Sequence, residues 1–196
     1  MRYALIGDIH SSNDDLQAVL TQIQDEATDA KIIGTGDLFE CTISKKDITD
    51  DKYSNLKDVL VNENHFSKYL TFPSVAGNQE ERILHITKTE DPLRNWIATI
   101  PETMELEGAT VIHGHQWTWG GEPWSLQHAQ IDERLVFYGH SHTSGIFYNG
   151  VPHPIVFNEW MDVKEGTVLV NVGSVIDNRE WVLYDSSLEK VMFKKA

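Results

Sequence analysis

The sequence YALIGDIH, residues 3–10, sets a pattern that the chain repeats: an apolar run ends at Gly7 and then presents Asp8 and His10. Four later runs also end at a glycine beside a side chain that can bind a metal: KIIGTGD (31–37), SVAGN (74–78), TVIHG (110–114) and LVFYGHSH (135–142). In open α/β sheets, ligands bind at the carboxyl ends of strands. We therefore expect one site, assembled from Asp8, His10, Asp37, Asn78, His113, His140 and His142.

Apolar periodicity around these runs predicts the elements. Residues 2–7 and 31–35 are expected as parallel strands flanking a helix that starts near Ser12. Helices are also expected near residues 55–70, 79–90, 96–100 and 125–131. Strands are expected at 72–76, 103–112 (a strand or a hairpin), 135–138, 145–148, 154–157, 167–171, 180–185 and 190–194, with a hairpin turn at Asn149-Gly150. The fold class is therefore α/β, with two mixed β-sheets packed as a sandwich and flanked by α-helices.

Length and composition favour a single domain over residues 1–196, with a polar surface insertion around 42–64. There is no apolar run long enough to span a membrane and no secretory-type segment, and Cys41 is the single cysteine, so a cytoplasmic protein is expected. The net charge of −14 disfavours binding to bulk nucleic acid. A small phosphorylated substrate is compatible with that charge if metal ions supply positive charge. The sequence leaves open whether the chain forms a homo-oligomer.

As an ordered set, five motifs resemble the calcineurin-like metallophosphoesterase superfamily: GDIH (7–10), GDLFE (36–40), GNQE (77–80), IHGH (112–115) and GHSH (139–142). The tail LVNVGSVIDNREWVLYD (169–185) also resembles the small YfcE-like phosphodiesterases. The resemblance implies a binuclear centre with two divalent transition metal ions. Mn is the first expectation, and Fe, Ni, Co and Zn are alternatives. The implied ligands are Asp8, His10, Asp37 and His142 for one ion, and Asp37, Asn78, His113 and His140 for the other.

The resemblance also implies an activity. We expect a phosphoesterase that hydrolyses a phosphodiester by in-line attack of a hydroxide bridging the two ions, with Asn78 orienting the phosphate. A phosphomonoesterase or a nucleotide pyrophosphatase is the enzymatic alternative. A binding scaffold that has kept the fold and lost turnover is the alternative of another class.

Two departures from the family pattern favour the diesterase. Gln79 stands where the family commonly has a histidine that serves the leaving group; glutamine can contact the substrate but cannot donate a proton as a general acid. His115 is the candidate substitute, although it could equally line the rim. Glu40 replaces the usual Asp or Asn, and Cys41-Thr42 replace the Arg-Gly of Ser/Thr protein phosphatases, so a bidentate arginine is missing at that position.

An aromatic cluster follows the fourth motif. Trp117, Trp119 and Trp124 lie in the stretch WTWGGEPW. They could form a stacking wall for a base or an aryl group, or they could pack the loop. Packing is the favoured interpretation.

Overall fold

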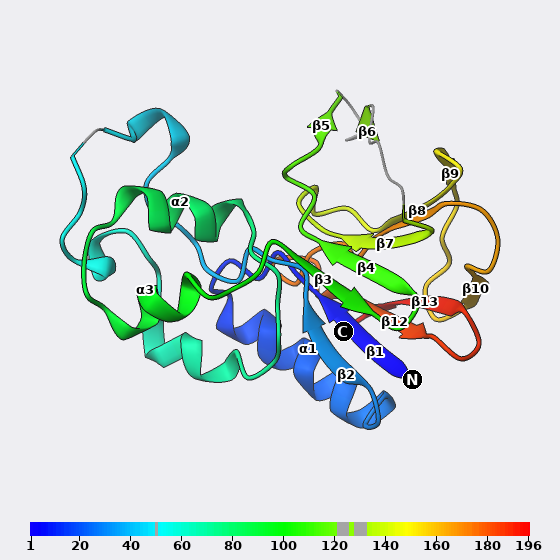
Figure 1. Cartoon of the computed structure of the whole chain (residues 1–196). Helices are drawn as coiled ribbons and strands as arrows, with labels where there is room; N and C mark the ends of the chain where they lie inside the picture. The colour runs from blue at the N-terminus through cyan, green and yellow to red at the C-terminus, as the bar shows by residue number, and fades with distance from the viewer. Residues whose placement is uncertain (50, 121–125, 128–132) are drawn as a thin grey trace.

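The computed structural model describes residues 1–49, 51–120, 126–127 and 133–196 (Figure 1). One sheet has the order β10-β13-β12-β1-β2, and its strands are β10 (Trp160–Asp162), β13 (Lys190–Lys195), β12 (Glu180–Asp185), β1 (Arg2–Ile6) and β2 (Lys31–Gly34). The other has the order β3-β4-β7-β11-β8-β9, and its strands are β3 (Thr103–Leu106), β4 (Ala109–Ile112), β7 (Leu135–Tyr138), β11 (Val168–Asn171), β8 (Gly145–Tyr148) and β9 (Val151–His153). A small ribbon pairs β5 (Thr118–Trp119) with β6 (Leu126–Gln127).

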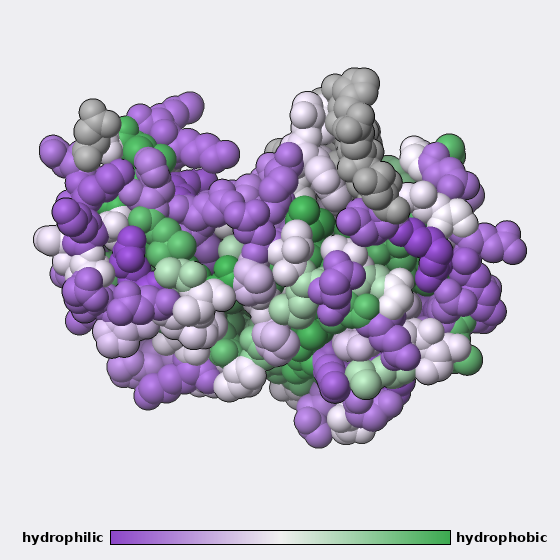
Figure 2. Space-filling model, viewed as in Figure 1, coloured by the Kyte–Doolittle hydropathy of each residue, from purple (hydrophilic) through white to green (hydrophobic). Residues whose placement is uncertain are grey.

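The helices are α1 (Asn13–Glu26), α2 (Asn78–Ile86) and α3 (Pro92–Ile97), with short 3-10 helices η1 (Lys45–Asp47), η2 (Leu56–Asp58) and η3 (Glu63–Tyr69). Figure 1 shows α2, α3 and the 3-10 helices gathered at one side of the sheets. Figure 2 shows a mostly hydrophilic face, which agrees with the acidic composition. Within the described part of the chain, no helix has the length and apolarity needed to cross a membrane.

Strand β1 lies inside its sheet, between β12 and β2, and is buried on both faces. It pairs parallel with β2 and antiparallel with β12. Because side chains alternate along a strand, Ala4 and Ile6 pack in the core that includes the buried face of α1, while Tyr3 and Leu5 pack in the second core with residues of the other sheet. The expected β-α-β start and the two-sheet sandwich are confirmed.

The expected helix near residues 55–70 is wrong. The chain there forms η2 and η3, and η3 is interrupted by Asn64 and His65, whose φ angles of 51° and 57° lie in the left-handed region. Consecutive left-handed residues cannot continue a right-handed helix. The segment around 42–64 buries Leu56, Val59 and Leu60 against the core, so part of it packs inside the molecule.

Other boundaries also differ from expectation. Residues 72–76 form a single parallel bridge, Gly34 to Ser74, because Pro73 has no N–H to donate. The helix expected at 79–90 ends at Ile86, and the next helix begins at Pro92, earlier than the expected residue 96. The strand expected at 154–157 is instead β9, because the tight turn at Asn149-Gly150 lets pairing restart at once. In the helix expected at 125–131, residues 126–127 are strand β6; the remainder lies outside the described residues.

Candidate metal centre

The seven candidate ligands lie where their strands end, and all come from one end of the sandwich. Asp8 and His10 follow β1, Asp37 follows β2, Asn78 begins α2, and the remaining ligands are His113 after β4 and His140 and His142 after β7. Backbone hydrogen bonds join the first two loops: Ile9 N–H donates to the Asp37 carbonyl at 2.8 Å and Asp8 N–H donates to that of Gly36 at 3.0 Å.

Five of the seven ligands have positive φ angles: Asp8 (49°), His10 (47°), Asp37 (51°), His140 (71°) and His142 (58°). Such non-glycine conformations are costly and cluster at functional sites. Glycines let the loops approach. A Cβ on Gly77 would lie 2.1 Å from Asp37 Oδ1, and one on Gly139 would lie 2.4 Å from Asp8 Oδ2.

The ligands form two groups, each with donor atoms within 4.8 Å of one another. The first contains Asp8, His10 and His142. The Nε2 atoms of His10 and His142 are 3.2 Å apart, and His142 Nε2 is 3.4 Å from Asp8 Oδ1. Donor atoms that share one ion at about 2.0–2.2 Å lie about 3 Å from one another, so these spacings fit a common ion.

The second group contains Asp37, His113 and His140. His113 Nε2 lies 3.3 Å from Asp37 Oδ2 and 3.3 Å from Asn78 Oδ1, which adds the amide to the group. Asp37 Oδ2 is also 3.6 Å from His10 Nε2 in the first group. Its other oxygen, Oδ1, accepts a hydrogen bond from Gln79 N–H at 2.9 Å. A single oxygen, Oδ2, therefore faces both groups.

Hydrogen bonds fix the imidazoles of His113 and His10 with Nε2 toward the site. His113 Nδ1–H donates to the Thr35 carbonyl at 2.8 Å, and His10 Nδ1–H donates to the Glu40 carboxylate at 2.5 Å. Such partners orient metal-binding histidines and make them more basic. Glu40, which departs from the family motif, thus has a positioning role that the sequence alone did not reveal.

The electrostatics of the site call for added positive charge. Asp8 is fully buried, and its Oδ1 has no hydrogen-bond partner among the described residues. Burial raises the pKa of Asp8 to about 7, and the Asp37 charge adds to the effect. Burial alone would lower the pKa of His113, but Asp37 raises it to about 9. A cation here would give Asp8 Oδ1 a partner and favour its ionised form, so the residues present fit divalent metal ions.

Glu80 is a further important residue that the sequence interpretation missed. It is fully buried, and its carboxylate accepts four backbone N–H bonds. The donors are Asp37 (3.0 Å), Leu38 (2.9 Å), Phe39 (3.0 Å) and Gly77 (2.8 Å). One side chain therefore joins the loop that carries Asp37 to the start of α2. The sequence signal that could have indicated this role is the acidic residue at the end of the GNQE motif.

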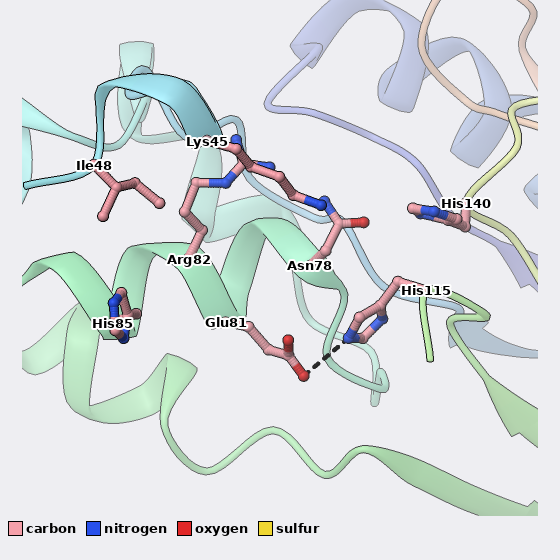
Figure 3. Close-up of a pocket in the computed structure, with 8 residues that line it drawn as sticks. All are labelled: Lys45, Ile48, Asn78, Glu81, Arg82, His85, His115 and His140. Carbon is pink, nitrogen blue, oxygen red and sulfur yellow. Dashed lines mark ion pairs between the residues drawn. The ribbon is translucent and has the colours of Figure 1, made fainter. Parts of the chain in front are cut away.

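The two other candidate residues occupy different environments. His115 lines a cavity of about 610 Å³ next to Asn78 and His140, and its Nε2 is 2.9 Å from Glu81 Oε1 (Figure 3). Gln79 is buried, and its side-chain oxygen accepts from Cys41 N–H at 3.2 Å. The side chain of Gln79 thus supports the second motif's loop, and it is not among the residues lining that cavity.

The tryptophans pack beside the site. Trp117 and Trp119 both contact Tyr138, with ring centroids 5.0 and 5.9 Å apart, and Trp119 Nε1–H donates to the Gly114 carbonyl at 2.9 Å. Trp119 also lies 5.6 Å from His140, ring to ring. These contacts favour packing for both; Trp124 lies outside the described residues.

Comparisons with known proteins bear on the family and the fold of the chain. A family model described as the calcineurin-like phosphoesterase superfamily domain matches residues 1–182. A metallophosphoesterase from Sphaerobacter thermophilus matches with 19% identity and a TM-score of 0.71, over 100% of this chain and 88% of its own. The E. coli phosphoesterase Yfce matches with 15% identity and a TM-score of 0.49, over 94% of this chain and 88% of its own. At 19% identity, the likeness to the Sphaerobacter protein is one of fold. A comparison with curated proteins finds no match.

Proposed function

Because the chain belongs to the calcineurin-like phosphoesterase superfamily, we propose that it is a phosphodiesterase that works with two divalent metal ions. The observation that carries the proposal is Asp37, whose Oδ2 faces both groups of ligands. Asp8, His10, Asp37 and His142 would hold one ion, and Asp37, Asn78, His113 and His140 the other. Two such ions, when bound, activate water and stabilise charge on the phosphoryl oxygens.

The chain's own residues orient the substrate. The Asn78 side-chain oxygen faces His113 Nε2 at 3.3 Å, so its NH₂ group is available to a phosphate oxygen in the adjoining cavity. Its position at the first residue of α2 adds the positive end of the helix dipole. We assign to Asn78 the orientation of the scissile phosphate and to Gln79 a supporting role through its bond to Cys41.

His115 is the side chain that we propose as the proton donor to the leaving group. Its Nε2 contacts Glu81, and its Nδ1 has no hydrogen-bond partner among the residues described. With Nε2 held by Glu81, Nδ1 is the ring nitrogen left to carry and donate a proton. The ring lines the cavity next to the candidate ligands, which is where a leaving group would lie.

We expect His115→Gln to lower kcat about 10²-fold or more for diesters with alkoxide leaving groups, because these need protonation. The kcat for bis(p-nitrophenyl) phosphate should fall far less, since p-nitrophenolate leaves without being protonated. Steady-state kinetics on both substrates checks this. The remote His153→Gln variant is the matched control. Equal losses on the two substrates would exclude proton donation by His115.

The diester preference is tested by comparing p-nitrophenyl phosphate with bis(p-nitrophenyl) phosphate in the presence of Mn²⁺. We expect kcat/KM to be at least about tenfold higher for the diester, because no arginine at Cys41-Thr42 is available to neutralise a dianionic monoester. A preference for the monoester would overturn the assignment.

A further inference from the structure

A cavity of about 610 Å³ extends from the candidate metal centre along α2. Its lining residues are Lys45, Ile48, Asn78, Glu81, Arg82, His85, His115 and His140. In Figure 3, the candidate ligands Asn78 and His140 lie toward one end and Ile48 and His85 toward the other, with Lys45 and Arg82 between them. This volume can hold a small organic group, so the cavity is large enough for part of a substrate.

Two cations of this cavity have no acidic partner. Neither Lys45 nor Arg82 has a carboxylate within ion-pair distance among the described residues, although acidic residues outnumber basic ones by 30 to 16 in the sequence. The Arg82 guanidinium donates a bond, at 3.3 Å, to the Ile43 carbonyl, and it also lies beside the Cys41 thiol. Its buried Nε has no partner within the described part of the chain. The one acid of the cavity, Glu81, is engaged by His115.

Helix α2 places Arg82 on the same face as Asn78. Asn78, Arg82 and His85 are spaced i, i+4, i+7 on α2, so they lie on one face. Arg82 follows Asn78 by about 6 Å along the helix axis, which is slightly more than one turn. Asn78 and Arg82 therefore present their side chains to the same cavity from positions one turn apart.

We propose that this cavity binds a second phosphate group, carried by the leaving group of the substrate. The inference rests on the proposed function, because it takes Asn78 as the site of the scissile phosphate. Arg82 supplies paired N–H donors and Lys45 a point charge, the two common ways in which proteins bind phosphate. His115 lines the same cavity, so a leaving group placed beside His115 lies next to Lys45 and Arg82.

The reaction is an ordinary hydrolysis. The P–O bond to the leaving group breaks, the water oxygen bonds to phosphorus, and the leaving oxygen takes a proton. The second phosphate is not altered. The released product keeps that phosphate and carries a new hydroxyl, so the substrate class is a phosphodiester whose leaving alcohol is itself phosphorylated.

Three dinucleotides with the same scissile bond test the inference: thymidylyl-thymidine without a terminal phosphate, and the two forms phosphorylated at the 5′ or the 3′ end. In the presence of Mn²⁺ we expect one phosphorylated form to be hydrolysed with kcat/KM at least about tenfold above the plain dinucleotide, because a charge-assisted contact is added. The ratio of kcat/KM for that phosphorylated form to kcat/KM for the plain dinucleotide should approach one in Arg82→Gln and in Lys45→Gln. Arg82→Lys, which keeps the positive charge, should retain part of the preference for the phosphorylated form. Lys57→Gln removes a lysine outside this cavity and should keep the full ratio.

The outcomes separate the two proposals. Hydrolysis of all three dinucleotides at equal kcat/KM would overturn the second-phosphate site and leave the diesterase intact. If Arg82→Gln lowers kcat/KM equally for all three dinucleotides, Arg82 acts at the scissile phosphate, and the second-phosphate site is likewise overturned. If none is hydrolysed, the diesterase fails, and equilibrium binding of thymidine 3′,5′-bisphosphate against thymidine 5′-phosphate decides. Tighter binding of the bisphosphate that is lost in Arg82→Gln supports the site, and equal binding rejects it.

Discussion

Asp37→Ala is expected to abolish turnover, lowering kcat by at least about 10³-fold, since a two-ion site contributes several kcal/mol to the transition state and each 1.36 kcal/mol is tenfold in rate. The physical reason is that Asp37 Oδ2 faces His10 Nε2 at 3.6 Å and His113 Nε2 at 3.3 Å, so one carboxylate serves both groups. Kinetics on bis(p-nitrophenyl) phosphate at saturating Mn²⁺ measures the effect.

Two variants sharpen this test. Asp37→Asn keeps the shape and the oxygen that accepts from Gln79 N–H, but removes the charge; we expect a loss close to that of the alanine variant. Asp25→Ala, at an exposed position of α1, is the matched control and should retain activity. Near-normal kcat in Asp37→Ala, with circular dichroism unchanged, would refute the shared-ligand role.

Glu80→Ala is expected to lower the free energy of unfolding by at least about 4 kcal/mol, because each buried N–H left without an acceptor costs about 1–3 kcal/mol. Four backbone donors lose their acceptor, and the side chain that leaves is fully buried. For a chain of this size the melting temperature should fall by about 8–16 °C. Urea titration and thermal melting followed by circular dichroism measure both quantities.

Conservative and remote variants accompany this test. Glu80→Gln keeps one acceptor oxygen but turns an NH₂ group toward two of the backbone donors, so we expect an intermediate loss. Glu90→Ala, at an exposed position, should change the free energy of unfolding little. A decrease below about 1 kcal/mol in Glu80→Ala would show that water or a rearranged loop replaces the carboxylate, contrary to the structure.

The features that the sequence predicted well depend on local repetition. The continuous apolar run at residues 3–6 predicted a buried strand, and the structure buries this strand on both faces. The glycine after each apolar run marks the strand end. Together these predicted the sandwich and the order of the motifs, and the expected superfamily is confirmed. The structure brings all seven expected ligands together, in two groups.

The features that were missed depend on contacts between distant residues. Glu80 bonds to residues 37–39, more than forty positions earlier, and Glu40 reaches back to His10. No spacing rule reports such pairs. The helix expected near residues 55–70 failed for a different reason: its apolar residues are buried as expected of a helix, but left-handed Asn64 and His65 redirect the backbone.

The central claim is that this chain holds two metal ions joined by Asp37, and metal analysis tests it most directly. Protein stripped with a chelator, reconstituted with Mn²⁺ and freed of unbound ions should contain about two ions per chain by mass spectrometry, and Asp37→Ala should contain one or fewer. Fewer than about one ion per chain in the reconstituted wild-type protein would contradict the account.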